Sequence, residues 1–340
     1  MTIATLDDLR EHLQWAIELE HCTLPPYLCA IYSIPPGRNQ EAAELIQSVF
    51  VEEMLHMVLA ANLLNAIGGT PVLDKPDFIP RYPGYLPHSA NAFLVPLARL
   101  SPATIETFMR IERPEAPDTP PEDDRYDTIG QFYQAIEASI TALCSALGET
   151  QVFTGDPVRQ FTPENFMYGG SGRIIPVYDL TSALQAIDEI EEQGEGLKHA
   201  EVWDGPRDMF HPEHEAVAHY FRYNEILTGR SYRRGDTPQS GPSGEPFVVD
   251  WDTVYPMRDN PRSADYPGGS PVRLKMTEFN TAYSDLLRGL HRACNGEPSR
   301  LSELVDVMFL VKQLAQELMQ LPSGDGITTA GPPFEYVPRP

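Results

Sequence analysis

The chain has 340 residues, of which 41% are hydrophobic and 22% are charged, so it can form a substantial core and is not a disordered protein. Its formal net charge is −24, and a protein of this sign is repelled by a phosphate backbone and by an anionic membrane surface. We therefore expect no binding to nucleic acid.

The cysteines and the first residues of the chain exclude other classes. Cys22, Cys29, Cys144 and Cys294 form no CxxC pair, which argues against a disulfide framework and against a zinc knuckle. The N-terminus is acidic where an export signal requires basic and then apolar residues, and no uninterrupted run of about 18 apolar residues occurs. These features predict a cytoplasmic protein with no membrane span.

The first two predicted helices are long and adjacent in the chain. Apolar residues recur at steps of three and four over about 5–33. Pro25 and Pro26 lie inside this helix, and we expect a kink or break near Thr23 because proline removes a hydrogen-bond donor and collides with the preceding turn. A second helix is predicted over 40–67, and the short connection makes the two helices antiparallel neighbours.

The rest of the chain predicts further helices separated by irregular stretches. Residues 70–126 form a long crossover with one short helix that starts at Ser101 and Pro102. The later helices are predicted over about 127–147, 181–196, 213–228, 276–295 and 300–321. A strand-like alternation is confined to a short segment, 248–254. The pattern predicts an all-α fold: a ferritin-like four-helix bundle with a long crossover, an extra C-terminal helical hairpin and long irregular loops.

We interpret residues 1–340 as a single domain with three parts. The bundle core covers 1–229, an irregular covering segment covers 230–272, and a helical hairpin with a tail covers 273–340. The irregular segment is rich in Pro, Gly, Asp and Ser. We expect this segment and the crossover to cover the mouth of a pocket in the bundle.

Polar residues on the apolar faces of the first two helices carry the strongest functional signal. Glu20 lies on the apolar stripe of the first helix, and Glu53 and His56 lie one turn apart on the buried face of the second. A Glu-x-x-His pair that faces a Glu on an antiparallel helix is half of a carboxylate-bridged dinuclear metal site. Carboxylates bridge two cations, and a neutral imidazole binds one ion while leaving positions open for dioxygen or substrate.

An ordinary structural role is the alternative for each of these residues. A single glutamate on a helix stripe is often a boundary residue or an ion-pair partner, here of Arg10 or Lys198. Most ExxH tetrapeptides bind nothing. Three such groups on the buried faces of two neighbouring helices favour a metal site.

The other half of a dinuclear site has to come from later helices. Glu137 lies on an apolar stripe, and His219 has apolar neighbours and is a candidate for the second imidazole. In the segment AIDEIEEQGEGLKH, periodicity does not choose among Glu191, Glu192 and Glu195, although the last two share one helix face.

Five segments carry a resemblance to a known family. LEHCTLPPYLCAIYSI, EEMLHMVLAANLLNAIGGTP, EEQGEG, HYFRYNEI and GPPFEY together resemble the ferritin-like domain of the iminophenyl-pyruvate dimer synthase type, over about residues 5–337. This family belongs to bacterial bisindole-pigment pathways, and its named enzymes are much longer chains that act on an oxidised tryptophan imine. The resemblance implies a polar bundle interior formed by Glu20, Glu53, His56, Glu137, Glu192, Glu195 and His219.

The motif and the resemblance together predict an enzyme of bacterial specialised metabolism. We expect a metal-dependent oxidase, oxygenase or oxidative coupling enzyme that acts on a small amino-acid-derived imine or amine with dioxygen. The expected cofactor is iron, as a di-iron centre, with manganese as an alternative, and a homodimer is compatible with the sequence. The other hypotheses are a mononuclear or metal-free enzyme of the same fold and a non-catalytic scaffold that binds a ligand or a partner protein.

Overall fold

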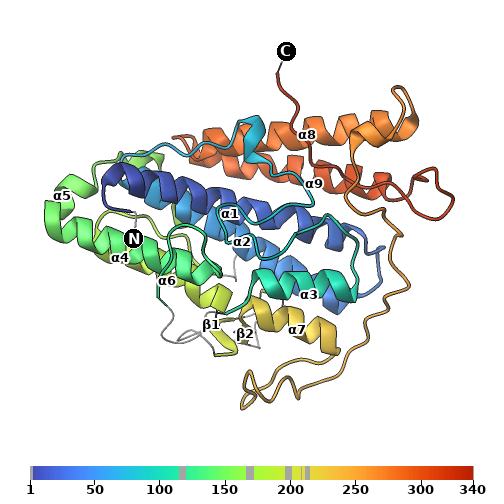
Figure 1. Ribbon diagram of the computed structural model, residues 1–340, viewed down its shortest axis with the longest axis horizontal. Helices are drawn as coiled ribbons and strands as arrows, with labels where there is room; N and C mark the ends of the chain where they lie inside the picture. Colours follow the sequence, from blue (N-terminus) through green and yellow to red (C-terminus); the bar gives the residue numbers. More distant parts are fainter. Residues whose placement is uncertain are drawn as a thin grey trace.

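The computed structural model describes residues 3–114, 120–165, 172–195, 201–207, 209–210 and 215–339. Long helices dominate these residues and run roughly along the longest axis of the molecule (Figure 1). The α-helices are α1 Leu6–Tyr32, α2 Gln40–Ala66, α3 Pro102–Ile111, α4 Ile129–Leu147, α5 Glu149–Val152, α6 Leu180–Glu195, α7 His219–Thr228, α8 Pro271–Ala293 and α9 Leu301–Leu318. Short 3-10 helices cover Pro76–Phe78, Pro157–Arg159, Pro163–Asn165, Ser263–Asp265 and Pro298–Arg300.

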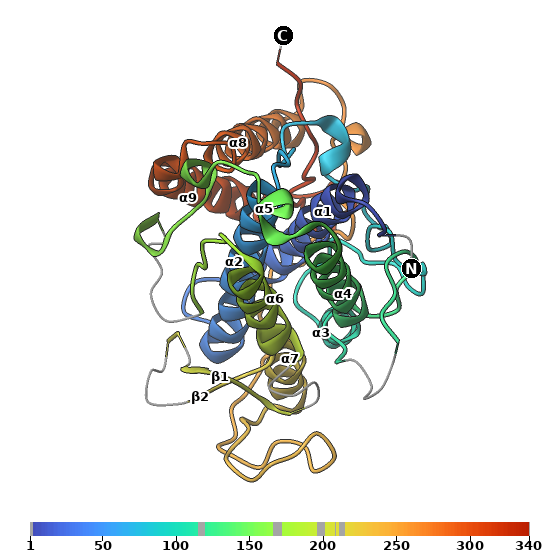
Figure 2. The ribbon, with the colours of Figure 1, turned by 90° about the vertical axis from the view of Figure 1, so that its left-hand side faces the viewer.

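The helices are arranged around a central pair. Seen along the bundle in Figure 2, α1 and α2 lie in the middle, α8 and α9 lie on one side, and α4, α6 and α7 lie on the other. Buried apolar residues from all these helices form one continuous core. Helix α7 contributes to it through Tyr223 and Ile226, which follow its first turn. The predicted ferritin-like bundle with a long crossover and a C-terminal helical hairpin is confirmed.

Helix α1 continues through its two prolines. Its N-terminus has the expected capping box, in which Thr5 and Asp8 bond to each other's backbone N–H groups. Pro26 cannot donate to the carbonyl of Cys22, and the hydroxyl of Tyr82 donates to that carbonyl instead, at 2.7 Å. Of the kink or break expected near Thr23, the break does not occur, because α1 is continuous over Leu6–Tyr32 and a side chain from the crossover supplies one of the missing donors.

The region before α7 differs from the prediction of a helix over 213–228. Strand β1, Trp203–Arg207, pairs in antiparallel fashion with β2, Glu215–Val217, and α7 begins only at His219. The short strand-like alternation at 248–254 forms no strand, which agrees with the irregular segment expected over 230–272. There the side chain of Asn39 bonds to both the backbone N–H and the carbonyl of Asp250, so this backbone binds to the turn between α1 and α2.

The irregular segment 230–272 covers one end of the bundle. Its backbone bonds to the turn after α1, where Tyr255 N–H donates to the carbonyl of Ser33 at 2.8 Å, and to the crossover, where Asn260 N–H donates to that of Leu97 at 2.8 Å. None of its residues lines either of the two cavities described below, the one beside Glu53 or the apolar one between α2 and α9. The expectation that it covers the pocket mouth is not met in this structure.

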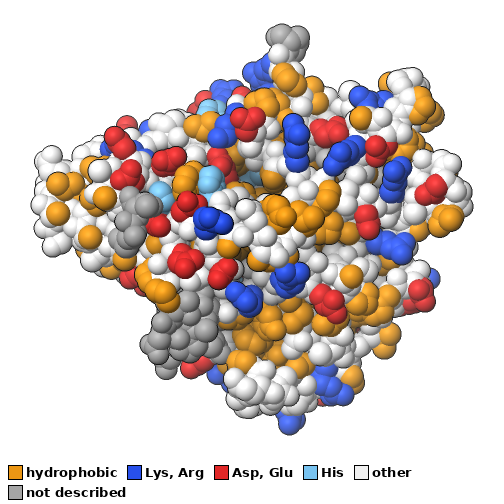
Figure 3. Space-filling model, viewed as in Figure 1, with side chains coloured by type: hydrophobic (Ala, Val, Ile, Leu, Met, Phe, Trp, Pro, Cys, Tyr) orange, Lys and Arg blue, Asp and Glu red, His pale blue; other side chains and the backbone are white. Residues whose placement is uncertain are grey.

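Among the described residues, helix α2 is the one helix that combines the length and the apolar composition of a membrane span. By length and composition alone it could cross a membrane, but 89% of its most apolar 18-residue window is buried inside the protein. A helix at the centre of a bundle has this property, because it is covered by other helices on every side. On the face shown in Figure 3, basic side chains lie among acidic ones, so the described side chains of this face form no broad patch of one sign.

Candidate metal centre

Two clusters of potential ligands lie side by side in the bundle. Glu20, Glu53 and His56 form the first, and Glu53, Glu112 and His219 form the second. In each cluster one ligand atom from every residue lies within 4.8 Å of the others, and all five residues are buried. Because Glu53 belongs to both clusters, the geometry provides two adjacent cation positions that share one carboxylate.

Four helices bring these residues together. Glu20 comes from α1, and Glu53 and His56 lie one turn apart on α2. Glu112 is the C-cap of α3, and His219 is the first residue of α7. Each imidazole directs Nδ1 at two carboxylates. His56 Nδ1 lies 3.7 Å from Glu20 and 3.6 Å from Glu53, and His219 Nδ1 lies 3.1 Å from Glu53 and 3.3 Å from Glu112.

The other nitrogen of each imidazole has a hydrogen-bond acceptor. His56 Nε2 lies 2.8 Å from Gln193 Oε1, and His219 Nε2 lies 2.8 Å from Glu52 Oε2. When Nε2 carries the proton and donates to these oxygens, the lone pair is on Nδ1 and faces the carboxylates. Metal-binding histidines are oriented in this way in proteins.

Arg222 balances the charge behind His219. Its guanidinium lies 2.8 Å from Glu52 and 2.6 Å from Asp204, and the arginine is only 1% exposed. It also donates to Ser48 Oγ at 3.0 Å and to the carbonyl of Val217. This buried network holds Glu52 in place as the acceptor for His219.

Each of the three carboxylates also accepts a hydrogen bond from a buried hydroxyl group. The pairs are Glu20 with Tyr133, Glu53 with Thr23 and Glu112 with Tyr27. These bonds fix the rotamers of the carboxylates, so the site is largely preorganised.

Burial and mutual contacts shift the pKa values of the titratable groups at this site. Burial raises the pKa of Glu20 to about 7 and also raises that of Glu112. Burial alone would raise the pKa of Glu53 as well, but contacts with His219 and His56 hold it below its usual range. Burial opposes the charged form of His56, yet Glu20 and Glu53 raise its pKa to about 10. Protons thus take the place of cations among these carboxylates, and oxygen with imidazole donors suits iron or manganese.

A small cavity of about 20 Å³ adjoins the ligands. The three residues of the first cluster line it together with the polar side chains of Glu112, Tyr133 and Glu191. The rest of its wall is formed by two glycines and three isoleucines: Gly130, Gly194, Ile111, Ile129 and Ile190. Arg113 also lines it and is exposed, which marks the side on which the cavity reaches the surface. A cavity of this size holds a water or a comparably small molecule.

The structure brings four of the predicted ligands together: Glu20, Glu53, His56 and His219. It does not bring Glu137 or Glu192 to them. Glu137 is half-buried on α4 and is in neither cluster, and Glu192 is exposed and lines pockets at the surface. The side chain of Glu195 lies outside the described residues.

Glu191 is the buried carboxylate of the acidic segment in α6. The buried face of this helix includes Ala183, Ile187 and Ile190, and this spacing continues to Glu191 and Gly194 rather than to Glu192. Glu191 therefore lines the cavity beside the ligand clusters but belongs to neither cluster, and the choice among Glu191, Glu192 and Glu195 as a ligand stays a prediction.

Glu112 was not predicted as a ligand, although the sequence contains a signal for it. Ile105, Phe108 and Glu112 are spaced by three and four residues, and all three are buried. The short helix α3 therefore has a glutamate at the end of its apolar stripe. Its position in a proline-rich crossover concealed this pattern.

Comparisons with known proteins agree with this architecture. A family model described as ferritin-like matches residues 13–228. Dichlorochromopyrrolate synthase of Lentzea aerocolonigenes is 26% identical, in an alignment that covers 99% of this chain and 37% of that protein. The 2-imino-3-(indol-3-yl)propanoate dimerase of Chromobacterium violaceum is also 26% identical, in an alignment that covers 96% of this chain and 33% of that protein. The chain spans about a third of the length of these curated relatives.

A solved structure shows the same fold. It is a ferritin-like protein from Caulobacter vibrioides, with a TM-score of 0.64, 23% identity and coverage of 98% of this chain and 99% of that chain. The family model covers more than half of the chain and includes all five residues of the two ligand clusters. The resemblance seen in the sequence is thereby confirmed, and the chain belongs to the ferritin-like family.

Proposed function

We propose that this chain is a metal-dependent enzyme that oxidises or oxidatively couples a small amino-acid-derived imine or amine, with dioxygen as the electron acceptor. The observation that carries the proposal is the carboxylate of Glu53, which both ligand clusters share. The names of the two curated relatives, a synthase and a dimerase of an imino acid, support an enzyme of this class.

The chain's own residues have definite roles in this proposal. Glu20, Glu53 and His56 would hold one ion, and Glu53, Glu112 and His219 would hold the other. Bound iron, or manganese, would supply the redox chemistry with dioxygen that protein side chains lack. Three isoleucines that line the cavity, Ile111, Ile129 and Ile190, keep bulk water away from the ligands.

The mouth of the cavity suits an anionic substrate. Arg113 is exposed and is the cation that lines the cavity among its described residues. A guanidinium binds a carboxylate with two parallel hydrogen bonds, so an imino or amino acid would bind at the mouth of the cavity with its carboxylate at Arg113, while the cavity itself admits a molecule as small as water or dioxygen. Replacement of Arg113 by Ala should raise KM about tenfold or more and leave the metal content unchanged.

Elemental analysis tests the metal site directly. Wild type should bind two ions per chain at the two clusters, and the Glu53→Ala variant should bind none, because it loses the shared ligand. Glu192→Ala is the matched control, since it removes a glutamate that lies outside both clusters. Equal metal content in Glu53→Ala and Glu192→Ala would refute the site.

Oxygen consumption separates an enzyme from a passive metal binder. Metal-loaded wild type should consume dioxygen when imino acids are generated in the assay from aromatic amino acids, and Glu53→Ala should not. A metal-loaded protein that consumes no dioxygen with any imine or amine would contradict the proposed function and favour a scaffold.

A further inference from the structure

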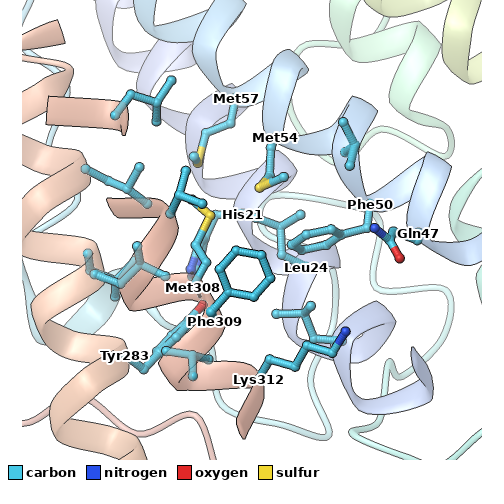
Figure 4. Close-up of a pocket in the computed structure, with 18 of the residues that line it drawn as sticks. His21, Leu24, Gln47, Phe50, Met54, Met57, Tyr283, Met308, Phe309 and Lys312 are labelled. Atoms are coloured by element: carbon cyan, nitrogen blue, oxygen red, sulfur yellow. Dashed lines mark hydrogen bonds between the residues drawn. The ribbon is translucent and has the colours of Figure 1, made fainter. Parts of the chain in front are cut away.

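A second, larger cavity lies on the opposite face of the central helix pair. It has a volume of about 160 Å³ and is enclosed by α1 and α2 on one side and by α8 and α9 on the other (Figure 4). The metal ligands face α3, α6 and α7 instead. Neighbouring residues separate the two sites: Glu20 and His56 face the metal centre, and His21 and Met57 line this cavity.

The wall of this cavity suits an aromatic ring. Met54, Met57 and Met308 lie close together around it, with Phe50 and Phe309 beside them (Figure 4). Methionine sulfur makes favourable contacts with aromatic rings, and its flexible chain adapts to different ligands. An apolar cavity of about 150 Å³ is large enough to bind benzene, so the volume here accommodates one ring with a short side chain.

Two polar side chains without protein partners stand on one side of the cavity. Lys312 is exposed and Gln47 is half-buried, and both side chains line the cavity on the same side (Figure 4). Within the described residues, neither makes a hydrogen bond or an ion pair through its side chain. A cation and an amide donor beside an apolar wall form a complementary surface for a carboxylate.

The inner end of the cavity has a neutral polar pair. His21 Nε2 lies 2.8 Å from the hydroxyl of Tyr283, and both side chains are buried. Among the described residues that line this cavity none is acidic, and Lys312 is the one that carries a charge. The inner end is therefore compatible with an aromatic ring, with or without a hydroxyl or N–H group.

We propose that this cavity is a binding site for a small aromatic carboxylate, with its ring among the methionines and its carboxylate at Lys312 and Gln47. The site lies behind the metal centre and binds its ligand without contact with the metal. Its occupancy stabilises the packing of the α8–α9 hairpin on the central helices, because a ligand that binds the native state alone stabilises that state.

Calorimetric titration with 3-phenylpropanoate and with its neutral amide, 3-phenylpropanamide, tests the proposal. Wild type should bind the carboxylate with a Kd below about 1 mM, and Met308→Trp, which fills the cavity, should weaken the binding of both compounds at least tenfold. Lys312→Gln should weaken the binding of the carboxylate about threefold and leave the binding of the amide unchanged, since an exposed charge contributes modestly to affinity. Lys275→Gln is the matched control, because Lys275 is paired with Glu278 and Glu317 and lies outside the cavity.

Other outcomes would overturn the proposal. These are no binding of 3-phenylpropanoate by wild type, equal binding by folded Met308→Trp, or the same effect of Lys312→Gln on both compounds. If Met308→Trp does not fold, the exposed Lys312→Gln still decides the matter. The Glu53→Ala variant, tested in parallel, should bind the carboxylate as wild type does, so loss of the metal centre and loss of this site are distinguished.

Discussion

The two faces of the α1–α2 layer place the same residue type in opposite electrostatic states. His21 and His56 are both buried, at 1% and 2% exposure. Burial lowers the pKa of His21 to about 3, because the charge of Glu18 offsets burial only in part and the ring is paired with the hydroxyl of Tyr283. Burial acts on His56 in the same direction, but Glu20 and Glu53 reverse the outcome and raise its pKa to about 10. Burial alone therefore does not decide the charge of a histidine, and the nearest carboxylates do.

This difference extends to what holds each face together. On the metal side, buried charges are kept in place by one another and by the hydrogen bonds of Tyr27, Tyr133 and Arg222. On the side of α8 and α9, packing of leucines, methionines and aromatic rings provides the contacts. The metal side should therefore respond to charge removal and to pH, and the apolar side should respond to lost volume.

The largest effect is expected from Arg222→Met. This change leaves Glu52 and Asp204 buried without their arginine and should lower the free energy of unfolding by about 3–5 kcal/mol, measured by urea denaturation. Arg234→Met is the control, because Arg234 is exposed where it pairs with Glu215 and should cost less than about 1 kcal/mol. Similar losses of stability in both variants would show that the buried ion pairs of Arg222 contribute no more to stability than the exposed pair of Arg234.

A volume change on the other face should cost less. Leu287 is 1% exposed and lines the apolar cavity, so Leu287→Ala should lower the free energy of unfolding by about 2–3 kcal/mol, at the lower end for buried leucines because space already adjoins it. The loss should be the same at about pH 6 and pH 9, since no titrating group is removed. A loss that varies with pH would contradict the contrast between the two faces.

The sequence predicted the parts of the fold and site that depend on helix periodicity. Glu20, Glu53 and His56 lie on long regular helices, where spacing reliably reports the buried face. His219 was predicted as a ligand, but the strand before it was not, because β1 and β2 are short and their pairing is a contact between two segments that the periodicity of either one does not report.

The parts that could not be predicted depend on contacts between distant segments. Glu112 ends the apolar stripe of a short helix in a crossover, so its spacing indicates burial, but its place beside Glu53 follows from how α3 packs. Tyr82 supports α1 at its prolines from 60 residues away. The apolar cavity likewise arises from the packing of α8 and α9 on the central pair, which no single helix pattern encodes.

A smaller effect is expected from pH, because the proton on His56 competes with a metal ion. Its pKa is raised from 6.5 to about 10, so in the metal-free protein the protonated ring contributes stability that is complete below pH 6.5 and is lost as pH rises through 10. A metal ion must displace this proton, so metal affinity should rise about tenfold per unit between about pH 7 and 9, measured by chelator competition. An affinity independent of pH would indicate that His56 is not a ligand.

The smallest effect is expected from Tyr133→Phe, and it separates a role at the metal centre from a role in the core. Tyr133 donates to Glu20, whereas Tyr126, also buried, donates to the carbonyl of Pro87 at 2.6 Å. Each Phe variant loses one buried hydroxyl bond and should lose about 1 kcal/mol of stability. Tyr133→Phe alone should also weaken metal binding about tenfold, because Glu20 is then less firmly held in its ligand position. Equal metal affinity in the two variants would limit Tyr133 to a core role and leave Glu20 positioned by α1 alone.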